Sequence, residues 1–339
     1  MVLVLTGCKS KLPTVASLTG PTSGFPGETL DFKVTGEDPG GRDLSYVADW
    51  GDTSGLAWSA PCPSGRQVTL QHVYSDTGLF RVRAKARAGA DNESEWSDSV
   101  QVRIREEPLA TPVVVCEAVN TGAALRLVWT AVTHAKSYEI VTDDSVFTIT
   151  SLSFDITTPT AFIELRAVNG SSRSDPATIN CRVIETASLV LYGINDPDPW
   201  HPSGLAFTTD GVACALSLDE ANRASLDFVC DDQNLLPVGF KNAGDYGWPQ
   251  NSKINALIDA GTTDYDAYVE AAASGYMTQL EIAANAVYAL WLSISPTWTT
   301  SDHYCKAKII SIEDVGGARK VTLKVGFQKI GGLRWVMSQ

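Results

Sequence analysis

The stretch "DLSYVADWGDTSG", residues 43–55, predicts an aromatic strand that ends at a sharp turn. Tyr46 and Trp50 alternate along it with Ala48, so one face of the strand carries two large aromatic anchors. Gly51 lets the chain turn sharply, and Asp52 can accept hydrogen bonds from the backbone amides of the turn. We therefore expect Trp-Gly-Asp to be a structural corner.

Alternation of apolar and polar residues recurs along the chain. In "LFRVRAKAR" (79–87) the side chains of Phe80, Val82, Ala84 and Ala86 face one way and four basic side chains face the other. "VQVRIR" (100–105), "LRLVW" (125–129) and "VTLKVGFQ" (321–328) repeat the pattern. Clusters of Gly, Pro, Ser and Asp separate these runs, so we expect an all-β chain of tandem immunoglobulin-like β-sandwiches.

Two changes in composition divide the chain. "REEPLATP" (105–112) is a charged, proline-bearing break after a strong strand, and Trp, Tyr and Asp become denser after "RVIETASL" (182–189). A length of 339 residues also favours two or three domains. The expected parts are a tether (1–11), two sandwiches (12–105 and 108–184), and a larger, mainly β domain (185–339).

The first sandwich resembles a PKD domain over its whole length. The motifs are "EDPGGRDLSYVADWGDTS" and "VTLQHVYSDTGLFRVRAKARAGADNESEWSDSVQVRI". The resemblance implies a β-sandwich of the kind common on microbial surfaces. Beside the structural corner, one functional alternative stays open. Asp38, Asp43 and Asp52 could form a calcium loop, because hard cations prefer clustered oxygen ligands.

The second sandwich resembles a fibronectin type III domain over about 75 residues. The residues that carry it are Trp129 in "LRLVWTAV", Tyr138 in "AKSYEI", and the stretch "FIELRAVNGSSRSDPATI". The resemblance implies that the tryptophan and the tyrosine pack in the core. It indicates a spacer or presentation module.

The last domain weakly resembles HmuY-like β-rich lipoproteins, some of which bind haem. The resemblance rests on the closing hairpins around "TSDHYCKAKI" and "VTLKVGFQ". We expect a mainly β domain with one helix near residues 252–260. The alanine-rich range 265–292 could instead be helical by propensity.

Charge and the first residues bear on location. A formal net charge of −13 disfavours nucleic acid and anionic membranes as partners. No apolar run is long enough for a membrane-spanning helix. Leu5-Thr6-Gly7-Cys8 resembles a bacterial lipobox, which implies export and a lipid on Cys8 as the sole membrane contact; the alternative is a frayed hydrophobic tail.

Six further cysteines suggest an oxidising compartment. Six cysteines permit 15 connectivities, and no Cys/His cluster has the spacing of a zinc site. Cys116–Cys181 and Cys214–Cys230 are the expected disulfides, since each pair brackets neighbouring strands. Free buried cysteines are the alternative.

Candidate binding residues lie in the last domain. The loop "NDPDPWHPSG" is either a proline-stiffened linker or a calcium or sugar site made by Asp196, Asp198 and Trp200. Trp248 in "DYGWPQ" and Trp298 in "SPTWTT" are candidates for a recognition platform. No phosphate loop, nucleophile elbow or HExxH motif occurs, so we expect no enzyme and no cofactor other than the optional calcium.

These features together predict a lipid-anchored surface protein of the bacterial envelope. Its expected role is non-catalytic binding or adhesion, with two sandwiches as a stalk and a surface polysaccharide or a protein as partner. Two alternatives stay open: a structural subunit of a surface layer or filament, and a glycan hydrolase with accessory modules.

Overall fold

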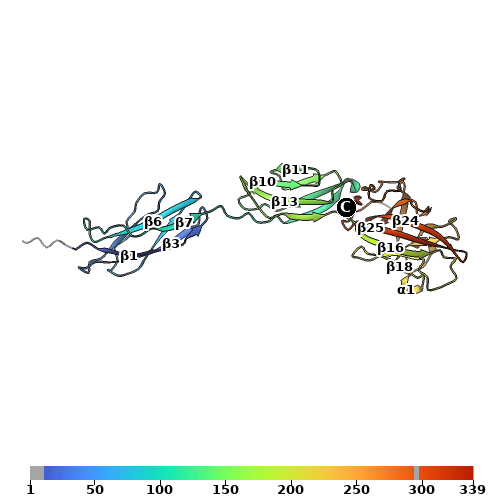
Figure 1. Cartoon of the computed structure of the whole chain (residues 1–339), viewed down its shortest axis with the longest axis horizontal. Helices are drawn as coiled ribbons and strands as arrows, with labels where there is room; N and C mark the ends of the chain where they lie inside the picture. Colours follow the sequence, from blue (N-terminus) through green and yellow to red (C-terminus); the bar gives the residue numbers. More distant parts are fainter. Residues whose placement is uncertain (1–10, 294–297, 339) are drawn as a thin grey trace, which may run out of the picture. The chain divides into compact units, whose positions relative to one another are not determined.

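The computed structural model describes residues 11–293 and 298–338. It divides into two compact units, Met1–Pro108 and Leu109–Gln339, whose strands are labelled in Figure 1. Strands dominate both units, and the one α-helix of the described residues is the single turn α1 (Glu220–Arg223). The all-β class is confirmed.

The first unit is a sandwich of two sheets. One sheet has the order β1-β3-β5 and the other the order β2-β7-β6-β4. The inward faces meet in one hydrophobic cluster that includes Phe32, Tyr46 and Val82. The strands are β1 (Thr14–Thr19), β2 (Ser23–Gly24), β3 (Thr29–Glu37), β4 (Ser45–Asp49), β5 (Val68–Val73), β6 (Gly78–Arg87) and β7 (Val100–Ile104).

The Trp-Gly-Asp stretch is the structural corner that the sequence predicts. Gly51 has φ +77°, and a Cβ there would lie 2.8 Å from the carbonyl oxygen of Arg81, so the turn requires glycine. Asp52 accepts a hydrogen bond of 2.9 Å from the amide of Ser54, and its other oxygen lies 2.7 Å from Nε2 of His72. The His72 ring stacks on Trp50 at 4.5 Å, which closes the corner.

The second unit begins with a sandwich of the same general kind. Its sheets have the orders β12-β9-β8 and β11-β10-β13-β14, with β15 also paired to β13. Trp129 and Tyr138 are both buried with ring centroids 5.3 Å apart, as the fibronectin resemblance implied. The strands are β8 (Val114–Val119), β9 (Ala124–Trp129), β10 (Ser137–Val141), β11 (Val146–Ile149), β12 (Ser153–Ile156), β13 (Phe162–Asn169), β14 (Ser172–Arg173) and β15 (Ala177–Asn180).

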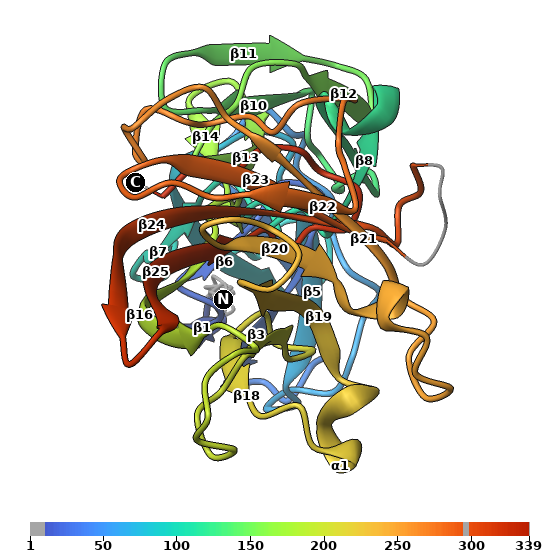
Figure 2. The same cartoon turned by 90° about the vertical axis from the view of Figure 1, so that its right-hand side faces the viewer.

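A second sandwich follows within the same unit, and its sheets are visible in Figure 2. Their orders are β16-β25-β24-β23-β21 and β18-β17-β19-β20-β22, and they enclose a core that includes Phe228, Leu290 and Val325. The strands are β16 (Ile184–Tyr192), β17 (Gly204–Phe207), β18 (Ala213–Leu216), β19 (Leu226–Asp231), β20 (Gly239–Asn242), β21 (Ile254–Asp259), β22 (Gln279–Glu281), β23 (Val287–Ser293), β24 (His303–Val315) and β25 (Ala318–Phe327).

The helix expected near 252–260 is wrong, because that range contains β21, paired antiparallel to β23. Asn255 and Leu257 point inward at alternate positions of this strand. The range 265–292 holds β22 and most of β23 and no helix. Pairing with neighbouring strands outweighs the helix propensity of its alanines.

The two sandwiches of the second unit share a core. Leu333 and Trp335, near the end of the chain, belong to the hydrophobic cluster of Leu125 and Trp129. The amide of Arg334 donates to Gly122 over 3.0 Å, and the indole of Trp335 donates to Ala123 over 3.3 Å. The segment 328–338, called the tail below, therefore completes the first sandwich of this unit after the chain has built the second.

Candidate functional site

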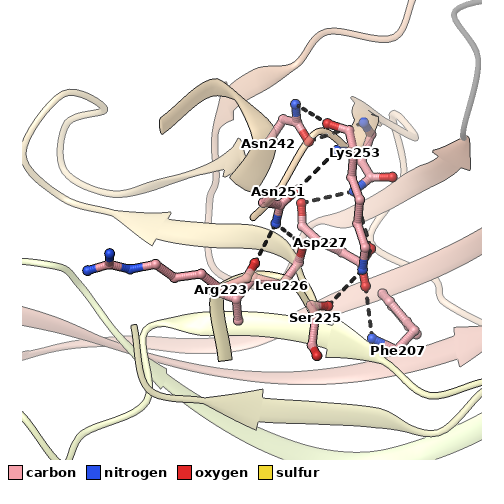
Figure 3. A network of polar contacts seen from close by, with 9 residues as sticks. Phe207, Arg223, Ser225, Leu226, Asp227, Asn242, Asn251 and Lys253 are labelled. Atoms are coloured by element: carbon pink, nitrogen blue, oxygen red, sulfur yellow. Dashed lines mark hydrogen bonds and ion pairs between the residues drawn. The ribbon is translucent and has the colours of Figure 1, made fainter. Parts of the chain in front are cut away.

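A buried carboxylate organises a polar network at one end of the last sandwich (Figure 3). Asp227 on β19 is 5% exposed. Its Oδ1 accepts hydrogen bonds from Nζ of Lys253 over 2.9 Å and from the side-chain amide of Asn255 over 3.3 Å, and its Oδ2 accepts the amide of Phe207 over 2.9 Å. Two separate segments, residues 253–255 and β17, therefore donate to this one carboxylate on β19.

The electrostatics of the network reflect its burial. Loss of water raises the pKa of Asp227, and the neighbouring Lys253 ammonium opposes that rise. Lys253 donates to the carbonyl of Ser225 over 2.8 Å as well as to Asp227. Because an ammonium has three N–H bonds, one remains for another acceptor. The pair is close to neutral in total charge and presents a donor.

The network forms part of the wall of a cleft of about 440 Å³. Aromatic rings contribute too, with Phe207 and Phe327 at a centroid separation of 5.6 Å. The other lining residues are Thr208, Thr209, Asp227, Lys253, Asn255, Leu292, Ser301 and His303. A concave site with apolar walls and a few fixed polar groups has the general make-up of a small-ligand site.

His303 at the start of β24 is held in a defined orientation. Its Nδ1 lies 2.9 Å from the carbonyl oxygen of Gln328, and its ring stacks on Phe327 at 4.8 Å. A carbonyl only accepts, so Nδ1 carries the proton and Nε2 of the neutral ring is an acceptor. The cleft therefore offers donors and acceptors on elements of both sheets.

The tryptophans selected from the sequence lie outside the cleft lining. Trp200 is 83% exposed, and its amide donates to Asp198 over 3.0 Å. Trp248 stacks on Tyr246 at 5.1 Å and is covered by the guanidinium of Arg223. Trp298 packs against the shared core and donates its indole N–H to Gly332 over 3.0 Å, so it is a structural contact of the tail.

The residues of the alternative calcium loop in the first unit are not assembled into a metal site. Asp38 binds the guanidinium of Arg42 at 2.7 Å, whereas Asp52 is engaged by His72. Asp43 and Asp52 lie before and after β4, a strand of about 17 Å, so the three carboxylates do not converge. Across residues 11–293 and 298–338 no group of three or more His, Cys, Asp or Glu side chains is arranged to hold a metal ion.

The loop 195–201 is built from local hydrogen bonds. Asp196 Oδ1 accepts the amide of Asp198 over 2.8 Å and lies 3.0 Å from Nδ1 of His201. The His201 ring stacks on Tyr192 at 3.8 Å. These contacts hold the loop in shape beneath the exposed Trp200.

The cysteines of the described residues are all free thiols. Pairing of Cys214 with Cys230 is wrong for this fold, because β17 lies between their strands and puts them about 9.5 Å apart or more, beyond disulfide range. Cys116 and Cys181 pack in one hydrophobic cluster as thiols, and their pairing stays a prediction. Cys8, the lipidation candidate, lies outside the described residues.

Lys253 and Asn255 are functional candidates that the sequence analysis did not single out. Both stand in "SKINALID" at alternate positions with Leu257; Asn255 lies on the inward face of β21, and Lys253 directly precedes the strand. Polar residues at inward positions of a strand are the signal that could have identified Asn255. Asp227 is one of 39 acidic residues of the chain, and its local sequence does not distinguish it from the others.

Comparisons with solved structures find two kinds of β-sandwich domain. The chain is similar, at 32% identity over 29% of its length and 99% of the other chain, to the PKD domain of an M14-like peptidase from a Thermoplasmatales archaeon, with a TM-score of 0.27. Part of the chain is similar to a PKD domain. A two-domain fibronectin type III segment of chicken tenascin is similar at 12% identity, over 49% of this chain and 97% of that chain, with a TM-score of 0.30.

These similarities match the PKD and fibronectin resemblances drawn from the sequence, and the all-β fold itself rests on the strands described above. No family model and no curated protein matches the chain. No helix within the described residues is long and apolar enough to cross a membrane.

Proposed function

We propose that the protein is a non-catalytic binding protein whose last sandwich holds a saccharide in the Asp227–Lys253 cleft. The observation that carries the proposal is the cleft itself, where an ion pair between the buried Asp227 and the partly exposed Lys253 meets two phenylalanine rings. The sandwiches before it would act as spacer modules. The ligand would be a neutral glycan of the cell surface or its surroundings.

The chemistry of the lining favours a sugar over an anion or a lipid tail. The ammonium of Lys253 and the carboxylate of Asp227 cancel in charge, so no net field selects an anion. Hydroxyl groups of a sugar can both donate and accept, which suits the free N–H of Lys253 and Nε2 of His303. The rings of Phe207 and Phe327 can pack against the apolar face of a sugar ring.

The arrangement supports binding rather than hydrolysis. A glycosidase needs two carboxyl groups at a defined separation. Asp227 is the one carboxylate among the described lining residues, and both of its oxygens already accept hydrogen bonds from the protein. Its raised pKa therefore has a structural cause in burial.

The location belongs to the same proposal. The lipobox-like stretch before Cys8 favours export, with a lipid on that cysteine as the anchor. Expression in a bacterium with Cys8→Ala as the variant tests it. The native chain should fractionate with membranes and carry a lipid mass, and the variant should be soluble. A native chain without lipid would contradict the anchor.

The binding proposal is tested on a glycan array with the chain from Lys9 onward. Neutral glycans should bind, and Ser301→Trp should abolish binding, because an indole at this exposed position of the lining fills the cleft without touching the network. Ser274→Trp is the matched control on an exposed loop away from the cleft. Its binding should equal that of the native chain.

Two results would contradict the proposal. A blank array with a folded protein would rule out a saccharide ligand. Equal binding by Ser301→Trp and the native chain would rule out the cleft as the binding site. Concentration-dependent assembly together with a blank array would favour the structural-subunit alternative instead.

A further inference from the structure

A ladder of basic side chains lies on the outer face of the first unit. Phe80, Val82, Ala84 and Ala86 of β6 point toward the core, so Arg81, Arg83, Lys85 and Arg87 point outward. Two residues of a strand rise about 6.7 Å, so these four cations extend over about 20 Å. The set is called the β6 ladder below.

Two indoles flank the β6 ladder. Trp96 lies under the guanidinium of Arg83 at 4.8 Å and the ammonium of Lys85 at 5.0 Å, and Trp58 lies under the guanidinium of Arg87 at 4.1 Å. Both indoles remain half-exposed. Cation–π contacts of this kind fix the long basic side chains and so reduce the entropy that a ligand would have to overcome.

The face of the first unit that carries the β6 ladder also has a buried apolar residue and a hollow. Val47 on β4 pairs with Lys85 and faces the same side, yet it is 1% exposed. At the end of the β6 ladder, Arg87 lines a hollow of about 470 Å³ together with Asp43, Ser45, Pro61, Gly89 and Ala90. The face therefore combines an ordered row of cations, aromatic edges and a cavity.

The carboxylates near the β6 ladder neutralise only its middle. Asp49 pairs with Arg83 at 2.9 Å, and Glu93 pairs with Lys85. Arg81 and Arg87 make no ion pair with any residue in 11–293 or 298–338, although the carboxylate of Asp43 shares the hollow with Arg87. Unsatisfied charge thus stands at both ends of the row, in a chain whose net charge is −13.

We propose that the β6 ladder is a second binding site, and that its ligand is an acidic polysaccharide. Carboxylates of the polymer would pair with Arg81 and Arg87, which can bind them in bidentate fashion. Sugar rings between those carboxylates would lie along the exposed edges of Trp58 and Trp96. The site is separate from the cleft, which takes a neutral ligand, and it lies on the other unit.

The test is titration calorimetry of the full chain with polygalacturonate, with neutral dextran as the comparison polymer. Polygalacturonate should bind, and dextran should not bind to Ser301→Trp, in which the cleft is filled. The affinity for polygalacturonate should fall steeply between about 0.05 M and about 0.5 M NaCl because salt screens exposed charges. Arg81→Ser with Arg87→Ser should weaken binding about tenfold or more.

The matched control is Lys33→Ser with Arg66→Ser, which removes the same charge from exposed positions outside the β6 ladder. Its affinity should change less than about twofold. The cleft variant Ser301→Trp should bind polygalacturonate normally, so failure of one site is distinguishable from failure of the other.

Three results would overturn the proposal. Equal losses in the ladder and control variants would show attraction to net charge alone, and binding that persists in 0.5 M NaCl would show a non-ionic site. The absence of polymer binding, together with self-association that the ladder variant abolishes, would make the face a contact between two copies.

Discussion

The two units close their cores in different ways. In the first unit the residues that seal the sandwich come from its own consecutive strands, as in the hydrogen bond of 2.9 Å from the hydroxyl of Tyr74 to the carbonyl of Trp50. In the second unit the seal of the first sandwich comes from the tail, about 210 residues later, through the 3.3 Å contact of Trp335 with Ala123. Sandwiches that follow one another in sequence therefore need not be independent domains.

The consequence is a difference in cooperativity. The first unit has one cluster and should unfold as one element. The second unit has a cluster that mixes residues 109–181 with residues 298–335, so neither of its sandwiches can lose its packing without affecting the other. We expect the full chain to show two unfolding transitions and not three.

Trp335→Ala should give the largest effect. The side chain is fully buried in the shared cluster, and removing a buried aromatic side chain costs about 3–5 kcal/mol. Differential scanning calorimetry should show a large fall in the transition temperature of the second unit and no change in that of the first. Trp200→Ala, at an 83% exposed position of the same unit, should change stability by less than about 0.5 kcal/mol.

Gly122→Ala tests the contact between the first sandwich of the second unit and the tail. Gly122 has φ +84°, and a Cβ there would meet the carbonyl oxygen of Gly332 at 2.2 Å, so the tail must move. We expect a cost of about 2–3 kcal/mol in urea unfolding of the second unit. Gly170→Ala carries backbone strain at φ +58° with open space around it and should cost about 1 kcal/mol. Equal costs would show that the contact with the tail is unimportant.

Acidification should lower the stability of the first unit through Asp38, an effect that the second unit lacks. Hydrogen bonds from the Arg42 side chain and amide lower the pKa of Asp38 to about 2 from its ordinary 3.8. A carboxylate with a lowered pKa in the folded state stabilises above its unfolded pKa, and this contribution is lost as pH falls from about 4 to about 2. Asp38→Asn should remove this slope from the first unit only, as measured by thermal melts at stepped pH. An unchanged slope would contradict the assignment.

The smallest expected difference between the units is in the alkylation rates of their buried cysteines. Burial raises the pKa of the Cys181 thiol to about 12, so its reaction with iodoacetamide at pH 8 should be very slow in the folded second unit. Mass spectrometry should detect alkylation of Cys181 much sooner in Trp335→Ala, while alkylation of Cys62 in the first unit should keep its native rate. Fast alkylation of Cys181 in the native chain would mean that the shared core opens readily.

Local patterns were enough to predict the strands and the corner. The alternation in 79–87 corresponds to β6, that in 125–129 to β9 and that in 321–328 to β25, because the strand period is visible in any short window. The turn at Gly51 was predictable because its positive φ and the hydrogen bond from Ser54 to Asp52 are local, whereas its contacts with His72 and Arg81 are not. The helix near 252–260 was wrong because β21 owes its conformation to pairing with β23, which is not a local property.

The cleft and the shared core depend on contacts between distant residues. Asp227, Lys253 and His303 lie on three different strands or loops, and no pattern within one of them indicates the others. Trp298 appeared in a Thr-rich stretch suited to recognition, yet Gly332 accepts its indole N–H, and its side chain packs against the shared core. A position in a polar loop does not by itself show that a ring is accessible.

Hydrogen exchange of the native chain and of Trp335→Ala is the most direct test of the shared core. The slowest amides of β9 and of β24 should exchange with the same opening free energy, and both should fall by the same amount in the variant, while β6 amides stay unchanged. A fall confined to β9, with β24 at its native protection, would contradict the account and leave the last two sandwiches as independent domains.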